Sequence, residues 1–216
     1  MQIAIVLFPR LTVLDAIGPY QALDNLPGAE VVFVAEQAGP VRDESGFLGL
    51  IADAALDDVP HPDMVLVPGG PGTDALTDGG PVADWLRRVD QTTTWTTSVC
   101  TGSLTLAAAG LLTGRRATSH WLALEQLARF GAVPVSERVV FDRKYVTAAG
   151  VSAGIDMGLT LAGRLAGDEV AQATQLMLEY DPQPPYTAGS PATAPAGITA
   201  RMRAASRYPQ PAGTPG

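Results

Sequence analysis

The only cysteine of the chain stands where a strand-like run changes abruptly into a helix-forming run. Residues 97–99 precede Cys100, and residues 104–110 are rich in Leu and Ala. In such a strand–turn–helix, the turn residue lies at the carboxyl edge of a sheet and faces unpaired N–H groups of the helix. Those groups and the helix dipole favour a thiolate, so we expect a nucleophilic Cys100 with a lowered pKa. The alternative is a buried structural thiol.

A second candidate is the loop at residues 68–72, Pro-Gly-Gly-Pro-Gly, which follows the apolar run 64–67. The loop can turn backbone N–H groups toward a ligand, so Gly70 and Gly72 are candidates for an oxyanion hole. It contains neither the GxGxxG pattern nor the GK[ST] of a phosphate loop, so nucleotide binding is not predicted. The alternative is a tight turn without catalytic duty.

Asp15 follows the first apolar run and a short loop, which also places it at the carboxyl edge of the predicted sheet. A carboxyl group there can serve as a general acid and base. The alternative is helix capping, a common role of Asp at the start of a helix.

Two more side chains could assist a thiol. His120 lies near a predicted strand end and could act as the base of Cys100, or it could satisfy a backbone carbonyl beneath Trp121. Thr101 could donate its hydroxyl to a substrate or cap the next helix. His61 lies between two prolines, and we expect it on a surface loop.

Short runs rich in Val and Ile alternate with helical patterns, as in a mainly parallel sheet buried on both faces. This pattern predicts an α/β sandwich, with a helix entered at Asp15 and an amphipathic helix over residues 81–89. Residues 40–52 and 135–147 alternate around tight turns, which predicts hairpins outside the main sheet. The expected strands cover residues 2–8, 31–36, 64–68, 95–99, 116–119 and 145–148.

The second half of the chain contains one unusual helix and a change of composition. Residues 152–165 are apolar on nearly all sides, which predicts a helix packed in the core or against a second subunit. Residues 181–216 are rich in Pro and Ala and are expected to form a mostly irregular tail that wraps the domain or a partner. A short helix is expected at 198–207, and the α/β domain should cover residues 1–180.

The composition excludes several classes of function. The chain has 14 Lys and Arg against 22 Asp and Glu, a net charge of −8, so a nucleic-acid partner is not expected. One cysteine and two histidines allow no internal disulfide and no zinc site of the usual kind, and no cofactor motif is present. Without a signal peptide or a membrane-spanning run, we expect a cytoplasmic protein that does not bind membranes.

Five segments together resemble the DJ-1/PfpI superfamily, in order and across residues 1 to about 180. This resemblance implies a flavodoxin-like three-layer sandwich, with a mainly parallel sheet and helices on both faces, and a homodimer. Within the superfamily the chain is most similar to the branch that holds the isocyanide hydratases and the amidase-like domains of AraC-type regulators. The segments are residues 14–19, 68–72, 99–102, 114–121 and 150–156.

The resemblance also implies a site and a small-molecule isocyanide substrate. Cys100 would attack the isocyanide carbon and form a thioimidate, with Asp15 as general acid and base and Thr101 orienting the substrate. Gly70 would contribute a backbone N–H, and Val151 resembles a position whose backbone carbonyl lies near the nucleophile. Peptidase-like and glyoxalase-like relatives carry His after the cysteine, where this chain has Thr101. The alternatives are a redox or ligand sensor and a glyoxalase or deglycase acting on reactive carbonyls.

Overall fold

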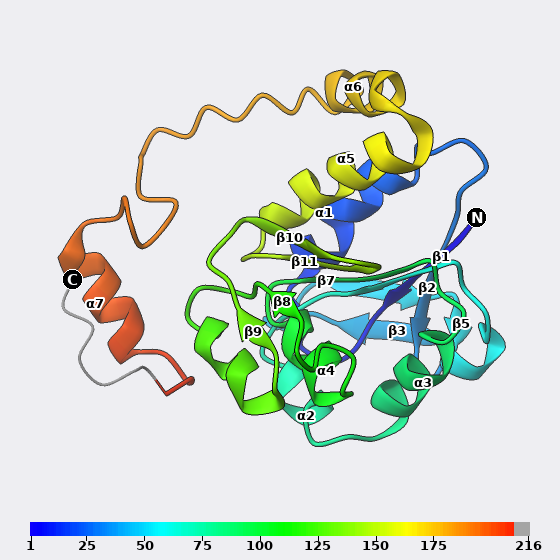
Figure 1. Cartoon of the computed structure of the whole chain (residues 1–216), viewed down its shortest axis with the longest axis horizontal. Helices are drawn as coiled ribbons and strands as arrows, with labels where there is room; N and C mark the ends of the chain where they lie inside the picture. Colours follow the sequence, from blue (N-terminus) through cyan, green and yellow to red (C-terminus); the bar gives the residue numbers. More distant parts are fainter. Residues whose placement is uncertain (210–216) are drawn as a thin grey trace.

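A seven-stranded sheet forms the centre of the computed structural model, which describes residues 1–209 (Figure 1). The strand order is β10-β11-β7-β6-β1-β2-β5, and every neighbouring pair is parallel except β10 with β11. The strands are β1 (Gln2–Val6), β2 (Glu30–Ala35), β5 (Ala54–Ala55), β6 (Met64–Val67), β7 (Trp95–Val99), β10 (Val139–Asp142) and β11 (Tyr145–Ala148). This is the flavodoxin-like α/β fold that the sequence predicts.

Helices cover both faces of the sheet (Figure 1). One layer contains α1 (Val13–Leu23), α5 (Ala153–Ala166) and α6 (Asp168–Met177). The other contains α2 (Thr73–Leu76), α3 (Pro81–Val89), α4 (Gly102–Ala108) and the 3-10 helices η1 (Leu56–Asp58) and η2 (Leu124–Phe130). The predicted amphipathic helix is confirmed as α3, which buries Val82, Trp85, Leu86 and Val89 on one face. No helix within residues 1–209 is long and apolar enough to cross a membrane.

The central strands explain why the candidate residues meet. All four residues of β6 are buried, as are the last four residues of β1, because helices cover the sheet on both sides. β1, β6 and β7 are adjacent and parallel, so their carboxyl ends lie at one edge. Asp15, the loop at residues 68–72 and Cys100 follow these three strand ends in turn.

Two predicted β elements differ from the structure. The segment at 116–119 is not a strand of the main sheet: only β8 (Arg116–Ala117) forms, and it pairs with β9 (Val133–Pro134) in a separate two-stranded sheet. The hairpin at 135–147 is not an excursion, because β11 pairs with β7 and β10 becomes the sheet edge. The other hairpin is confirmed as β3 (Gly39–Arg42) with β4 (Gly49–Ala52).

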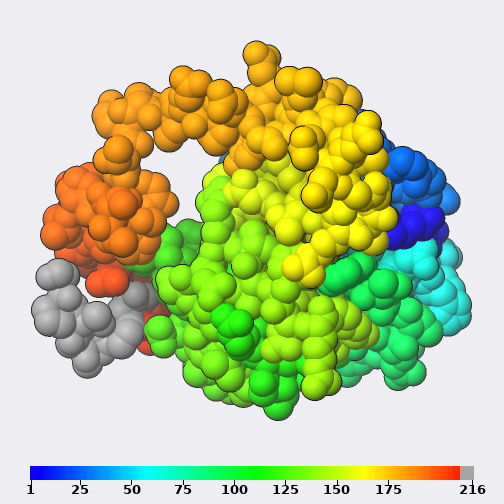
Figure 2. All heavy atoms as spheres, turned by 45° about the horizontal axis from the view of Figure 1, so that its top comes forward, coloured from blue at the N-terminus to red at the C-terminus, as the bar shows by residue number. Residues whose placement is uncertain are grey.

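The run at 152–165 forms α5, which packs between the sheet and its neighbours α1 and α6. After α6, residues 181–195 form neither helix nor strand and arch away from the rest of the molecule (Figure 2). The chain then forms α7 (Ala196–Ala204), close to the short helix predicted at 198–207, and returns to the α/β body. The end of the expected tail, residues 210–216, lies outside the described residues.

Candidate active site

Cys100 lies in a sharp turn between β7 and α4, as the sequence predicts. Its φ is 58°, a left-handed conformation that is rare for residues other than glycine, and its side chain is only 5% exposed. The turn persists because the Cys100 N–H donates to the carbonyl groups of Ala148 and Ala149, at 3.0 and 3.1 Å. A strained residue of this kind at the carboxyl edge of a sheet is typical of nucleophile elbows.

The environment of the Cys100 thiol contradicts the expected lowering of its pKa. Burial raises this pKa most, and the negative charge of Asp15 raises it further. Backbone hydrogen bonds from Thr101 and Val151 act in the opposite direction but do not compensate. The thiol therefore stays protonated while Asp15 is ionised, and it can become a thiolate only when a proton passes to a neighbouring group.

Asp15 is the neighbouring group that can take this proton. It lies in the first turn of α1 and is fully buried, and its Oδ2 accepts the N–H of Gly69 at 2.9 Å. Burial raises its pKa from 3.8 to about 7, although the hydrogen bonds with Gly69 and Cys100 lower it. The capping alternative does not hold, because Thr12 occupies the N-cap position of α1.

The glycine loop, residues 68–72, connects Asp15 with Thr101, the residue that follows the nucleophile. Gly69 donates its N–H to Asp15, and Gly70 donates its N–H to Thr101 Oγ1 at 2.9 Å. The Gly70 N–H is thus engaged within the protein, and the expectation that it contacts the substrate directly does not match this geometry. Thr101 makes no side-chain capping bond to α4. Its oxygen accepts from Gly70, and its O–H donates to the Gly70 carbonyl at 3.4 Å, a long bond that the O–H can exchange for one to a ligand.

Gly72 lies apart from this cluster. Its N–H donates to the Arg10 carbonyl at 3.1 Å, and it faces a neighbouring hollow on the other side of the loop rather than the cysteine pocket. A Cβ at this position would meet the Phe8 ring at 2.9 Å. The structure therefore gives Gly72 a packing role and does not bring it to the candidate oxyanion site.

Val151 and His120 line the pocket above the thiol. Val151 has a φ of 40°, a strained value for a β-branched residue, and its hydrogen bond with Cys100 lowers the thiol pKa, as an N–H donor does and a carbonyl does not. His120 accepts the N–H of Leu122 on Nδ1 at 3.3 Å. Burial, and then the charge of Arg207, lower the pKa of His120, so it is neutral at pH 7. The contact with Leu122 is structural, but its partner is a backbone N–H rather than the backbone carbonyl that the structural alternative expects.

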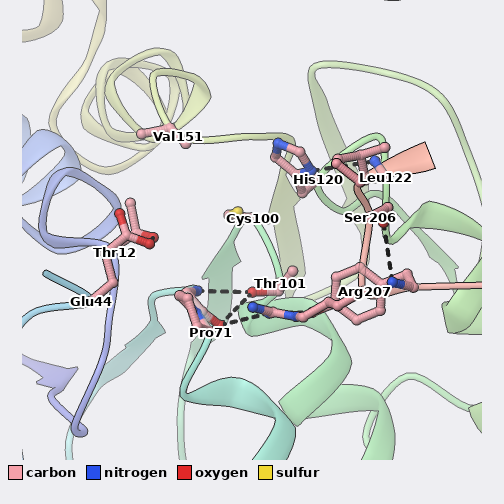
Figure 3. Close-up of a pocket in the computed structure, with 13 residues that line it drawn as sticks. Thr12, Glu44, Pro71, Cys100, Thr101, His120, Leu122, Val151, Ser206 and Arg207 are labelled. Atoms are coloured by element: carbon pink, nitrogen blue, oxygen red, sulfur yellow. Dashed lines mark hydrogen bonds between the residues drawn. The ribbon is translucent and has the colours of Figure 1, made fainter. Parts of the chain in front are cut away.

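The thiol opens into a pocket of about 400 Å³ (Figure 3). Thr12 and Glu44 line one side, and residues 205–208 of the tail line the other. Sequence reasoning missed both walls: Thr12 and Glu44 belong to no motif, and the helix expected at 198–207 gave no sign that it would reach Cys100. Within residues 1–209, no group of three or more His, Cys, Asp or Glu side chains is arranged to hold a metal ion.

A family model matches this arrangement of strands, elbow and loop: the model of the DJ-1/PfpI family covers residues 1–164. The chain belongs to the DJ-1/PfpI family. Its similarity to the isonitrile hydratase of Pseudomonas putida is 45% identity over 207 residues, which is 95% of this chain and 90% of the relative. A solved ThiJ/PfpI family protein from Pseudomonas syringae superposes with a TM-score of 0.91 at 40% identity, covering 94% of this chain and 84% of that one.

The chain is also similar to part of a transcriptional regulator. The HTH-type transcriptional regulator GbdR of Pseudomonas aeruginosa is 32% identical over 178 residues, which is 81% of this chain but only 48% of the regulator. Asp15, Cys100, Thr101 and Val151 all lie within the residues that the family model matches, whereas the pocket wall at 205–208 lies beyond them.

Proposed function

We propose that the protein is an isonitrile hydratase, which adds water to an isocyanide and releases an N-substituted formamide. The observation that carries this proposal is the pairing of a buried acid, Asp15, whose pKa is about 7, with a protonated nucleophile, Cys100. Hydration of an isocyanide carbon needs one nucleophile and repeated transfer of one proton, which this pair can supply. The identity to the Pseudomonas putida isonitrile hydratase over nearly the whole chain supports the same reaction.

The first half of the reaction attaches the substrate to the protein. The Cys100 proton passes to Asp15, and the resulting thiolate attacks the terminal carbon of R–N≡C. Asp15 returns the proton to that same carbon, so the product is a thioimidate, R–N=CH–S–Cys100. The Thr101 hydroxyl, held by the Gly70 N–H, is placed to orient the substrate as charge moves from the sulfur.

The second half releases the product. Asp15, now a carboxylate, takes a proton from water while the water oxygen attacks the thioimidate carbon. That proton moves to the substrate nitrogen, and the C–S bond breaks as the carbonyl of R–NH–CHO forms. The hydroxyl proton of the intermediate returns to the Cys100–Asp15 pair, which restores the starting state. The sum is R–N≡C plus H₂O giving R–NH–CHO, with no redox change.

The test is the rate of N-formamide formation from phenyl isocyanide by the purified protein. Turnover should disappear in Cys100→Ala and Asp15→Asn and persist in Asp24→Asn, an exposed change at the other end of α1. If the parent lacks turnover although Cys100 still reacts with a thiol probe, the hydratase proposal fails. Turnover of methylglyoxal in its place would favour the glyoxalase alternative.

The sensor alternative depends on a different property of the same thiol. Oxidation-sensing cysteines are exposed and ionised near neutral pH. Cys100 is buried and its pKa is raised, which argues for a thiol that is activated by its partner Asp15 rather than by solvent.

The homodimer expected from the family is also a proposal. Leu14 on α1 is 44% exposed, and it lies in an apolar hollow with Ile17, Ile155 and Leu178 on the outer face of α1 and α5. A second copy packing on this face would bury it. A Leu14→Arg variant that stays dimeric in analytical ultracentrifugation would exclude this interface.

A further inference from the structure

Arg207 attaches one wall of the pocket, residues 205–208, to the glycine loop. Arg207 Nη2 donates to the Gly70 carbonyl at 3.1 Å, and Arg207 Nε pairs with Asp74 Oδ2 at 3.3 Å. Tyr208 extends the contact, because its hydroxyl lies 2.5 Å from Arg207 Nη2 and 3.4 Å from Asp74 Oδ1. Arg207 thus bridges the tail, the glycine loop and α2.

The Gly70 carbonyl, which accepts from Arg207, belongs to the glycine loop. This loop also binds Asp15 and Thr101. The N–H groups of Gly69 and Gly70 donate to Asp15 and Thr101, on the inner side of the loop. The Gly70 carbonyl accepts from Arg207, from the N–H and Oγ1 of Thr73 at 3.1 and 2.7 Å, and from Thr101 Oγ1 at 3.4 Å. Arg207 therefore ties the pocket wall to the outer side of the loop, whose inner side binds Asp15 and Thr101 and whose Gly70 carbonyl keeps its bonds to Thr73 when Arg207 is removed (Figure 3).

The segment that leads to this wall is exposed along nearly its whole length. Within residues 181–195 only Ala194 is half-buried, and the segment forms no helix or strand. Beyond Arg207, Gln126 Nε2 donates to the carbonyl of Pro209, the last described residue, at 3.1 Å. The position of residues 205–208 therefore depends on the contacts of Arg207 and Gln126, because the exposed segment before them has few buried contacts that would oppose opening of the pocket.

We infer that Arg207 is a positioning residue, which fixes residues 205–208 as one wall of the pocket and thereby limits which isocyanides reach Cys100. This inference rests on the proposed hydratase function for its substrate, but the wall itself can be tested without turnover. Arg207 is paired with Asp74, and the Glu44 carboxylate lines the opposite side of the pocket, so an anionic R group is disfavoured there. Uncharged R groups fit a wall of this kind.

The test compares Arg207→Ala with Arg207→Lys, Asp74→Asn and the control Arg201→Ala, an exposed change on α7 away from the pocket. Loss of the anchor should raise KM for phenyl isocyanide about tenfold, the equivalent of roughly 1.4 kcal/mol, and leave kcat within about twofold. Arg207→Lys should restore part of the affinity, since it keeps the charge opposite Asp74 but not the forked geometry. Asp74→Asn should give a smaller increase of the same kind.

A second measurement does not depend on turnover: the rate at which Cys100 reacts at pH 9 with iodoacetamide and with a bulky maleimide. Arg207→Ala should accelerate the bulky reagent several-fold more than the small one, whereas Arg201→Ala should change neither. An unchanged KM together with an unchanged ratio of labelling rates would overturn the inference. A fall in kcat and melting temperature without a change in that ratio would also overturn it, as it would show a structural role only. Selective labelling in a protein without turnover would support the wall and reject the hydratase.

Discussion

Asp15 and Cys100 act on each other's ionisation in opposite directions, because the Asp15 carboxylate disfavours the thiolate whereas the hydrogen bond with the Cys100 thiol favours the carboxylate. The charge of Asp15 raises the pKa of the Cys100 thiol, and burial raises the pKa of Asp15 itself to about 7. Two adjacent anions in a buried site repel each other, so the pair retains one proton from about pH 7 up to strongly alkaline pH. This one-proton state can exist as thiol and carboxylate or as thiolate and carboxylic acid, and the second form is the one that attacks an isocyanide.

The pH dependence of kcat/KM should follow the first ionisation of this pair. Below about pH 7 Asp15 and Cys100 both carry protons, and no group can accept the thiol proton. We expect kcat/KM to rise with pH through about 7 and then to stay level, because the raised pKa of Cys100 puts the second ionisation far higher. Stopped assays of formamide formation from about pH 5 to 9 test this. A maximum on the acid side of neutrality followed by a decline would contradict it.

Glu44 should tune that ionisation. Its carboxylate lies on the pocket wall and raises the pKa of Asp15. Glu44→Gln should therefore move the acidic limb of the profile to lower pH, whereas Glu30→Gln, an exposed change at the start of β2, should not. Identical limbs in parent and Glu44→Gln would show that the charge is screened by solvent.

Asp15→Asn should stabilise the protein while it abolishes turnover. Folding raises the pKa of Asp15 from 3.8 to about 7. The contribution of Asp15 to the free energy of unfolding is therefore most favourable below pH 3.8, and it is lost as the pH rises through about 7. Removing the ionisable group should increase the free energy of unfolding by roughly 2–3 kcal/mol at about pH 8 and much less at about pH 4. Urea unfolding at both pH values, with Asp24→Asn as control, measures the difference. A gain that does not change with pH would contradict the assignment.

The sequence predicts those parts of the site that depend on local order along the chain. The change from strand to helix at Cys100 is visible in neighbouring residues, and Asp15 follows the first strand by a short loop, so parallel strands bring both to one edge. The sign of the Cys100 pKa shift could not be predicted in this way. It depends on burial and on the distance to Asp15, which exist only in the folded chain.

The pocket walls could not be predicted either, because they depend on contacts between residues that are far apart in the sequence. Arg207 lies at the end of the short helix expected in the Pro-rich and Ala-rich tail, and only folding places its guanidinium against the Gly70 carbonyl. The sequence likewise predicts a main-sheet strand at residues 116–119, yet β11 is the strand that pairs with β7. A short strand-like run does not specify its partner strand, so such assignments need tertiary contacts.

Gly69→Ala should remove activity without unfolding the protein. An added Cβ would lie 2.5 Å from the Thr101 backbone nitrogen and 2.9 Å from Asp15 Oδ2, so the loop would have to move away from both. A displacement of about 1 Å at such a site can cost on the order of a hundredfold in kcat/KM. Gly197→Ala is the control, because nothing lies within 4 Å of its added Cβ. Equal kcat/KM in the two variants would mean that the loop does not position the acid.

Thr101→Val should separate the acceptor role of this side chain from its shape. Valine has nearly the shape of threonine but cannot accept the N–H of Gly70, which would remain buried without a partner at a cost of about 1–3 kcal/mol. We therefore expect a lower free energy of unfolding and a lower kcat, both measured in the same mildly alkaline buffer. Thr101→Ser keeps the hydroxyl and should restore most of each. If valine kept the kcat and stability of the parent while serine did not, the methyl group rather than the hydroxyl would be the part of Thr101 that matters, and its assigned contact with the substrate would be wrong.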